Sequence, residues 1–260
     1  MPKTFASRKV KTLFHVLKGG GARAAWSLLN RRLVEVSRAM PGGLMRVGTC
    51  FFRCPDEESR TLILEGIYEA PELFAVQSFV RRDLPVVEFG GSLGVVACLL
   101  NQRLRKPQNH VVVEADPELI SILSENRNRN HCRFEIIHGA GGASGSPARI
   151  YLSSGTLCAS LNLTGDRFVD VPAITLSNIL QEKGFGRCAL VCDIEGAESR
   201  LIRDELETLQ SRVETLIVEF HPKITGPDDV ENSRRLLAER GFQQVWTGLD
   251  TQVFQNAALN

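Results

Sequence analysis

The stretch Ala189-Leu190-Val191-Cys192-Asp193-Ile194-Glu195 places two carboxylates directly after a short apolar run. The run predicts a buried strand, and negative charge at the end of a buried strand is costly unless it has a function. Two more apolar runs upstream carry an acid at or near their ends, Glu88 and Glu114. Acids at the ends of successive strands indicate a ligand crevice at the carboxyl edge of a sheet.

Short apolar segments alternate with helical segments from residue 85 onward. Strands are predicted over 85–89, 110–114, 133–138, 188–193, 213–220 and 251–255. Helices are predicted over about 94–104, 116–127, 175–183, 197–210 and 228–240. This alternation predicts an α/β fold with a mostly parallel sheet, and the short turn before 251–255 predicts an antiparallel hairpin at one edge. Before it we expect short strands and turns over 44–66 and a helix from Pro71 to Arg82. We expect 148–174 to be extended or irregular.

The charge of the chain is balanced overall and uneven along its length. The 260 residues carry a net charge of +1, so no polyanionic partner such as a nucleic acid is indicated. Residues 1–46 hold ten Lys and Arg and only one acid, Glu35. We therefore predict a basic helical segment over 1–45 ahead of a domain over 46–260. Packing of this segment on the domain is the favoured interpretation; contact with an anionic membrane or a role as an organellar transit peptide are the alternatives.

No apolar run approaches the ~18 residues of a membrane span. The seven cysteines are odd in number and scattered, which is typical of reduced thiols. We accordingly expect a cytoplasmic protein, and the oligomeric state is left open.

The glycine turn after the first predicted strand indicates the class of ligand. Its candidate cofactor-binding residues are Glu88, Gly90, Gly91, Ser92 and Gly94. The spacing differs from the Gly-x-Gly-x-x-Gly fingerprint of dinucleotide-binding proteins. A carboxylate just before the glycines repels phosphate and suits a sulfonium or ammonium group. The turn therefore favours S-adenosylmethionine over NAD.

Further cofactor contacts are predicted along the same edge. Glu114 can accept hydrogen bonds from both ribose hydroxyls. Gly139 and Ala140 follow the third strand and leave room for a flat adenine. Asp193 is expected beside the reactive end of the cofactor.

Three residues are catalytic candidates: Asp193, Glu195 and His221. Either Asp193 or His221 can act as the general base, because both follow neighbouring strands at the same edge. Glu195 can orient the cofactor or hold the acceptor. Glu198 is interpreted as an acid that favours a helix N-terminus. A carboxylate–histidine cluster could also bind a divalent metal, but we rank acid–base chemistry above it and expect no metal.

Taken together, these residues resemble the FkbM-type methyltransferases, a family of S-adenosylmethionine-dependent O-methyltransferases. The resemblance runs from about Gly66 to Asn256 and is most specific at 193–198. Its other parts are Gly66-Ile67-Tyr68-Glu69, Val87–Gly94, Val113-Glu114-Ala115-Asp116-Pro117, Gly139-Ala140, Val171–Leu176 and Val218-Glu219-Phe220-His221. It adds Glu69 and Ala115 to the cofactor-binding candidates. The chain departs from the family in having Glu88 for Asp and Gly91-Ser92-Leu93 for Ala-Asn-Ile/Val.

The resemblance implies a seven-stranded, Rossmann-like class I methyltransferase fold. It also implies methyl transfer to a hydroxyl of a sugar, a polyketide or another secondary metabolite. Two rival functions belong to other classes. A nucleotide-binding oxidoreductase is disfavoured by Glu88 and by the missing third fingerprint glycine. A non-catalytic module that docks on a membrane or partner through residues 1–45 is disfavoured by the acids at 193 and 195.

Overall fold

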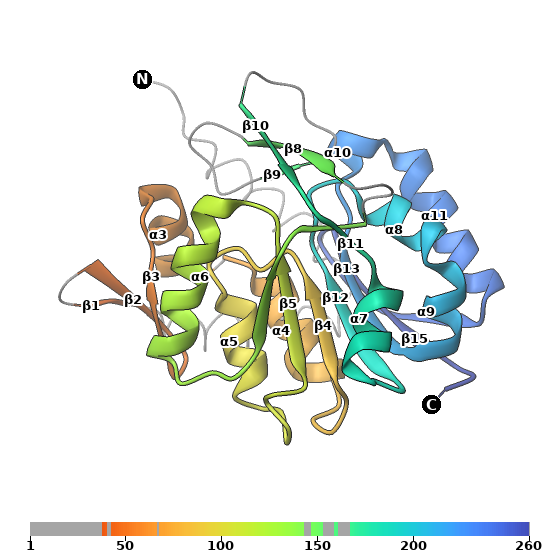
Figure 1. Cartoon of the computed structure of the whole chain (residues 1–260), viewed down its shortest axis with the longest axis horizontal. Coiled ribbons are helices and arrows are strands. Elements are labelled where there is room, and N and C mark those ends of the chain that lie inside the picture. Colours follow the sequence, from red (N-terminus) through yellow and green to blue (C-terminus); the bar gives the residue numbers. More distant parts are fainter. Residues whose placement is uncertain are drawn as a thin grey trace.

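A seven-stranded sheet forms the centre of the molecule (Figure 1). The structure is a computed structural model that describes residues 38–40, 43–66, 68–142, 147–152, 159–160 and 167–259. The strand order is β14-β15-β13-β12-β4-β5-β6. The strands are β4 (Val86–Phe89), β5 (His110–Glu114), β6 (Glu135–His138), β12 (Cys188–Cys192), β13 (Val213–Glu219), β14 (Phe242–Gly248) and β15 (Thr251–Asn256).

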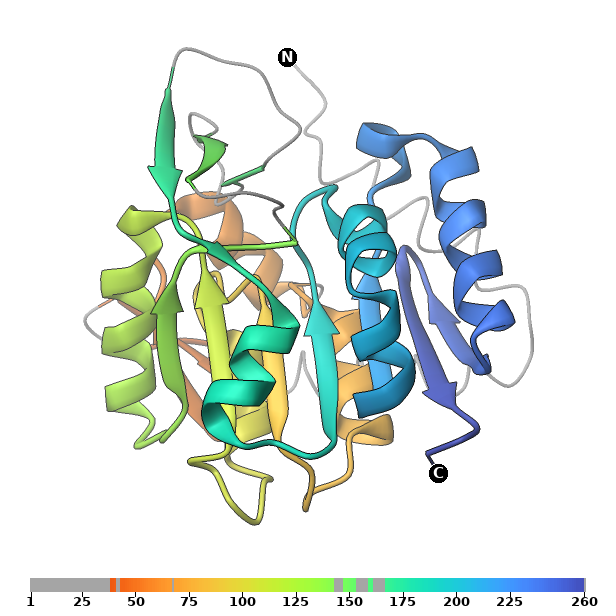
Figure 2. The ribbon, with the colours of Figure 1, turned by 45° about the vertical axis from the view of Figure 1, so that its right-hand side comes forward.

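The direction of the strands confirms the fold predicted from the sequence. Strands β13, β12, β4, β5 and β6 are parallel, and β15 pairs antiparallel with both β13 and β14. The carboxyl ends of the parallel strands meet along one edge, at the top in Figure 2, whereas β15 points the other way. This arrangement is the Rossmann-like class I methyltransferase fold, with its antiparallel terminal hairpin.

Helices cover both faces of the sheet because successive strand residues face opposite sides. Val86 belongs to the core on one face and Val87 to the core on the other. The first face is covered by α4 (Ala70–Phe79), α5 (Val95–Asn101) and α6 (Pro117–Arg129). The second is covered by α7 (Leu176–Lys183), α8 (Glu198–Asp204), α9 (Leu206–Arg212) and α11 (Pro227–Glu239). The parallel strands are therefore buried on both sides, which explains their nearly continuous apolar sequences.

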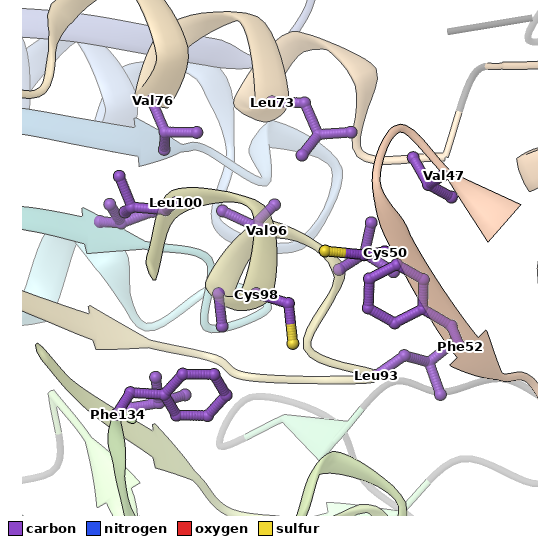
Figure 3. Close-up of a cluster of buried hydrophobic side chains, with 14 of the residues drawn as sticks. Val47, Cys50, Phe52, Leu73, Val76, Leu93, Val96, Cys98, Leu100 and Phe134 are labelled. Atoms are coloured by element: carbon purple, nitrogen blue, oxygen red, sulfur yellow. The ribbon is translucent and has the colours of Figure 1, made fainter. Parts of the chain in front are cut away.

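A small antiparallel sheet extends the first core. It consists of β1 (Arg38–Met40), β2 (Leu44–Val47) and β3 (Cys50–Arg53). Figure 3 shows Cys50 and Phe52 of this sheet beside Leu93 and Cys98 of the central fold. The side chains of Asn126 and Asn130 on α6 accept from the backbone N–H groups of Arg53 and Phe51, each at 2.7 Å. These hydrogen bonds give partners to backbone N–H groups along the edge of β3 and attach the small sheet to α6.

Two predicted segments differ from the structure. Glu57–Leu64 form a helix, α3, where turns were predicted, because Asp56 caps it by accepting from the N–H of Ser59 at 2.7 Å. The predicted helix 197–210 is divided into α8 and α9 at Glu205. The carboxyl of Glu205 accepts from the N–H of Leu176 and so holds the first turn of α7.

The region 148–174, predicted to be extended or irregular, contains the short strands β8 (Ala148–Leu152), β9 (Ala159–Ser160), β10 (Phe168–Val171) and β11 (Ala173–Ile174). Strand β11 pairs in parallel with β7 (Ala140–Gly141), which precedes that region. Strands β8, β9 and β10 form an antiparallel sheet that lies above the carboxyl edge of the central sheet (Figures 1 and 2). This sheet and the neighbouring short helix α10 (Pro222–Thr225) lie at the edge that carries the predicted site.

Most of the predicted basic helical segment, residues 1–37, lies outside the described residues. Within that prediction, Arg38–Met40 form a strand instead of a helix. Among the described helices, none has the length and hydropathy needed to cross a membrane.

Candidate active site

The glycine turn after β4 brings the backbone of two strands together. Gly90 has a φ of +91°, and a Cβ atom built on it would lie 1.8 Å from the carbonyl oxygen of Asp193. Gly90 donates to the carbonyl of Val113 and Asp193 donates to that of Phe89, both at 2.9 Å. Only glycine fits this crossing, since any side chain would overlap the Asp193 backbone. The turn therefore fixes Asp193 at the carboxyl edge of the central sheet, next to the end of β4.

Ser92 and Glu114 join the turn to the end of β5. The N–H of Ser92 donates to Oε2 of Glu114 at 2.7 Å, and the N–H of Asp116 donates to Oε1 at 2.7 Å. Ser92 Oγ also lies 3.2 Å from the hydroxyl of Tyr68. Burial raises the pKa of Glu114, against these backbone hydrogen bonds. Each carboxylate oxygen can accept a second hydrogen bond, so the ribose contact of Glu114 stays a prediction.

Glu88 lies beneath the turn, inside the core. It is 2% exposed, and its Oε2 is 3.3 Å from Nε2 of His110 without a hydrogen bond between them. Burial raises the pKa of Glu88 to about 8 and lowers that of His110 to about 3. Near pH 7 the pair is therefore mostly an uncharged acid beside a neutral imidazole. The proposed contact of Glu88 with a cofactor remains a prediction.

Glu69 also lies on the inner side of the site, at the start of α4. Its Oε2 is buried and has no hydrogen-bond partner. Burial, followed by the charge of Glu88, raises its pKa to about 8. A buried carboxyl oxygen without a hydrogen-bond partner at this position fits a cationic ligand group.

The small residues predicted to contact adenine, Gly139 and Ala140, pack against other parts of the protein. A Cβ atom on Gly139 would lie 2.5 Å from Cγ1 of Ile174 and 2.8 Å from the carbonyl oxygen of Pro172. Ala140 is buried and pairs with Ala173 of β11. The small side chains at 139 and 140 therefore allow β11 to pack against β7. Contact of these residues, or of Ala115 beside them, with adenine is not tested by this geometry.

The three catalytic candidates do come together. His221 Nε2 lies 3.3 Å from Oε2 of Glu195 and 3.6 Å from Oδ1 of Asp193. Its Nδ1 lies 2.9 Å from Oε1 of Glu198, which is only 1% exposed. The same Glu198 oxygen accepts from the N–H groups of Ile194 and Gly196 at 3.2 and 2.9 Å. Glu198 thus shapes the 193–198 turn and orients the histidine, a role the sequence interpretation missed.

The charges around His221 decide which candidate can take a proton. Burial opposes a charge on His221, but the hydrogen bond to Glu198 and the charges of Asp193, Glu198 and Glu195 outweigh it and raise its pKa to about 10. Burial, followed by the charge of Glu219, raises the pKa of Asp193 well above its usual range. At neutral pH His221 is already protonated, so Asp193 is the better candidate base.

Backbone strain gathers at the same place. Five described residues other than glycine have a positive φ, and three of them are predicted site residues: Glu69 at +47°, Ser92 at +45° and Glu195 at +52°. Such conformations cost on the order of 1–3 kcal/mol and persist where the surrounding structure enforces them. Their concentration along one sheet edge supports a functional site there.

Comparison with protein families gives a match over the part of the chain that forms the parallel core. The sequence model described as Methyltransferase FkbM domain matches residues 84–243. The chain belongs to the FkbM methyltransferase domain family. The match covers the parallel core and the site at its carboxyl edge, and the expected family resemblance is confirmed.

Solved structures resemble this FkbM-family chain at low identity. A protein of the NADB-Rossmann superfamily from Streptococcus agalactiae is 13% identical, with 71% of this chain and 67% of that chain covered and a TM-score of 0.45. Sp1610 of Streptococcus pneumoniae, solved with S-adenosyl-L-methionine, is 14% identical over 72% of each chain with a TM-score of 0.45. Ribosomal protein L11 methylase from Lactobacillus delbrueckii subsp. bulgaricus is 13% identical over 71% of this chain and 75% of that chain with a TM-score of 0.38. No curated protein matches the chain.

The cofactor of the FkbM family is S-adenosylmethionine, and the residues of this site fit it. The tight packing at Gly90 and Gly91 brings the turn close to the backbone of Asp193 and to the end of β5. The buried Oε2 of Glu69 has no hydrogen-bond partner, and Glu88 adds a second carboxyl near it. A cofactor with sulfonium and ammonium groups is complementary to these two carboxyls.

Proposed function

We propose that this FkbM-family methyltransferase transfers a methyl group to a hydroxyl of a sugar, a glycan or another secondary metabolite. The observation that carries the proposal is the position of Asp193, a partly buried acid with a raised pKa at the carboxyl end of β12, beside the glycine turn. An alcohol is a weak acid, so an oxygen acceptor needs a base that removes its proton during attack. Amine acceptors deprotonated in solution do not need one.

Residues at the ends of β4 and β5 would hold the cofactor. Gly90, Gly91, Ser92 and Gly94 would lie beside the cofactor, and Glu114 would accept from its ribose. Glu69 would face its cationic end. When bound, S-adenosylmethionine supplies an electrophilic methyl group on sulfur.

Asp193 would accept the proton of the acceptor hydroxyl at one of its carboxylate oxygens. Its raised pKa makes it a stronger base than an ordinary aspartate once ionised. His221, protonated and held by Glu198, would stabilise the ionised form of Asp193 from 3.6 Å. Glu195 would hold the acceptor from the opposite side of His221. The sheet β8–β10 above the edge would limit access of water to the reacting groups.

The proposal also covers the cellular compartment and the partners of the reaction. All six cysteines in the described ranges are free, which suits a reducing compartment such as the cytoplasm. A small hydroxylated molecule is the proposed partner, and nucleic acid is not. Peripheral contact of residues 1–45 with an anionic membrane stays a proposal.

The test is transfer of a radiolabelled methyl group from S-adenosylmethionine to a panel of sugars, glycans and hydroxylated metabolites, with matched amines beside them. We expect product from a hydroxylated acceptor, and loss of at least ~100-fold in kcat for Asp193→Asn with cofactor affinity within a few-fold. The control variant is Asp204→Asn, an exposed acid of α8. Product from amines alone, or full turnover in Asp193→Asn, would contradict the proposal.

A further inference from the structure

We propose that Glu72, Asp193 and Glu219 bind a divalent cation at the inner end of this crevice. The three residues come from α4, the end of β12 and the end of β13, which are far apart in the sequence. Each offers one carboxylate oxygen, and the three oxygens all lie within 4.8 Å of one another. Oxygens on opposite sides of a bound Ca²⁺ are about 4.8 Å apart, and those around Mg²⁺ about 4.2 Å, as twice the usual metal–oxygen distance.

The clearest sign of a missing cation is Glu72. It is 4% exposed, and among the described residues no hydrogen bond or ion pair involves its side chain. One of its carboxylate oxygens lies within 4.8 Å of oxygens of Asp193 and Glu219. Three carboxylates this close can all be ionised together only if a positive charge lies among them.

Asp193 supplies a second oxygen ligand. Its Oδ1 atom is buried and accepts no hydrogen bond, although it lies 3.6 Å from Nε2 of His221. A cation at the proposed site would contact both Glu72 and Asp193. Glu219 adds a third oxygen ligand and is positioned at the strand end, where Thr251 donates to its Oε2 at 3.4 Å.

A second group of possible ligands, Asp193, Glu195 and His221, lies beside the first and shares Asp193. There the imidazole already occupies the space between the acids, with Nε2 at 3.3 and 3.6 Å from their oxygens and Nδ1 bound to Glu198. Glu72 has no such neighbour. We therefore assign the cation to Glu72, Asp193 and Glu219.

The ligand chemistry narrows the identity of the ion. Three carboxylate oxygens without sulfur or nitrogen suit hard cations such as Mg²⁺, Mn²⁺ or Ca²⁺. The site needs further oxygen ligands to complete six-fold coordination, and these can be waters or the hydroxyl of an acceptor. If the proposed function holds, a cation bound to Asp193 would bring an acceptor hydroxyl to the proposed base; that step rests on the proposed function, whereas cation binding does not.

The experiment titrates the full-length protein with Mn²⁺ alone, without S-adenosylmethionine, and follows free Mn²⁺ by electron paramagnetic resonance. We expect one Mn²⁺ per chain, displaced by excess Mg²⁺ or Ca²⁺. Glu72→Gln and Glu219→Gln should each weaken binding by at least ~10-fold. Glu195→Gln should change it by less than ~3-fold, and the exposed Glu118→Gln should not change it.

Thermal unfolding of each variant distinguishes loss of the cation site from a failure to fold. Without Mn²⁺, Glu72→Gln should unfold at the same temperature as the wild type or a higher one, because a neutral amide replaces an acid that lies close to two other carboxylates. With Mn²⁺, the wild type should gain thermal stability and Glu72→Gln should not. No binding to the wild type, unchanged binding in Glu72→Gln, or a larger loss in Glu195→Gln than in Glu72→Gln would overturn the assignment.

The two proposals can fail separately. Methyl transfer that continues unchanged in excess EDTA, together with no Mn²⁺ binding, would remove the cation and leave the proposed function. Mn²⁺ binding that depends on Glu72 would keep the cation site even if every hydroxylated acceptor failed.

Discussion

The Nδ1 atom of His221 lies 2.9 Å from Oε1 of Glu198, a carboxyl that is almost completely buried. That oxygen also accepts from the N–H groups of Ile194 and Gly196. One buried acid therefore determines both the backbone of the 193–198 turn and the charge and orientation of the histidine. Because His221 in turn lies close to Asp193 and Glu195, Glu198 helps to position all three catalytic candidates.

Glu198→Gln should lower the pKa of His221 from about 10 by removing both a charged hydrogen-bond partner and a negative charge. The histidine pKa can be followed by NMR titration of its ring protons. Glu207→Gln, an exposed acid on α9, is the matched control. An unchanged His221 pKa in Glu198→Gln would contradict the assigned role.

The contact between His221 and Glu198 also predicts how the stability of the protein depends on pH. The folded pKa of His221 is raised above the unfolded value of ~6.5, so the stability it contributes is complete below pH ~6.5 and is lost as the pH rises toward about 10. The difference in unfolding free energy between wild type and Glu198→Gln should therefore be largest near pH 6.5 and shrink toward pH 10. Urea unfolding across this pH range measures the difference in unfolding free energy. A difference that grows with pH would contradict the raised pKa of His221.

Gly90→Ala should be strongly destabilising, by ~3 kcal/mol or more, because its new methyl would overlap the carbonyl oxygen of Asp193. Gly184→Ala isolates the cost of the backbone conformation. Gly184 also has a positive φ, but a Cβ atom there has nothing within 4 Å, so we expect a loss of only ~1 kcal/mol. Equal losses in the two variants would show that the close approach of Gly90 to Asp193 is not what requires glycine.

Glu88→Gln should stabilise the protein at alkaline pH. Burial raises the pKa of Glu88 to about 8, so the cost of ionising it is absent below pH ~4.5, grows between pH ~4.5 and 8 and levels off above 8. The variant should match the wild type near pH ~4.5 and exceed its unfolding free energy by roughly 3–5 kcal/mol at pH 9. The comparison is made without cofactor, with the exposed Glu118→Gln as control. A loss of stability at pH 9 would indicate that ionised Glu88 has a partner.

Much of the fold followed from local sequence. The apolar runs ending at Phe89, Glu114 and Cys192 are buried on both faces of the sheet, and such strands have a signal that needs no long-range information. The helix over 57–64 was missed because its cap, Asp56, precedes a charged sequence that resembles a turn. The break at Glu205 was missed because its carboxyl acts on Leu176, which is distant in the sequence.

Site residues that follow the ends of strands could be predicted from the sequence, whereas residues on other elements could not. Asp193, Glu195 and His221 were brought together as expected, because β12 and β13 are neighbours. Glu72 was missed because it lies on α4, a helix buried in the core, and its sequence neighbourhood gives no sign that it faces Asp193. The packing of Gly139 against Pro172 and Ile174, which also requires a small residue, was not foreseen, and its contact with adenine stays a prediction.

The most direct measurement is calorimetric titration of the protein with S-adenosylmethionine and, in parallel, with NAD. The account predicts micromolar S-adenosylmethionine binding, no NAD binding, and at least ~10-fold weaker S-adenosylmethionine binding in Glu114→Gln, as expected when a ribose hydroxyl loses a charged acceptor. Asp193→Asn should bind the cofactor within a few-fold of the wild type. NAD binding without S-adenosylmethionine binding would contradict the assignment of this crevice.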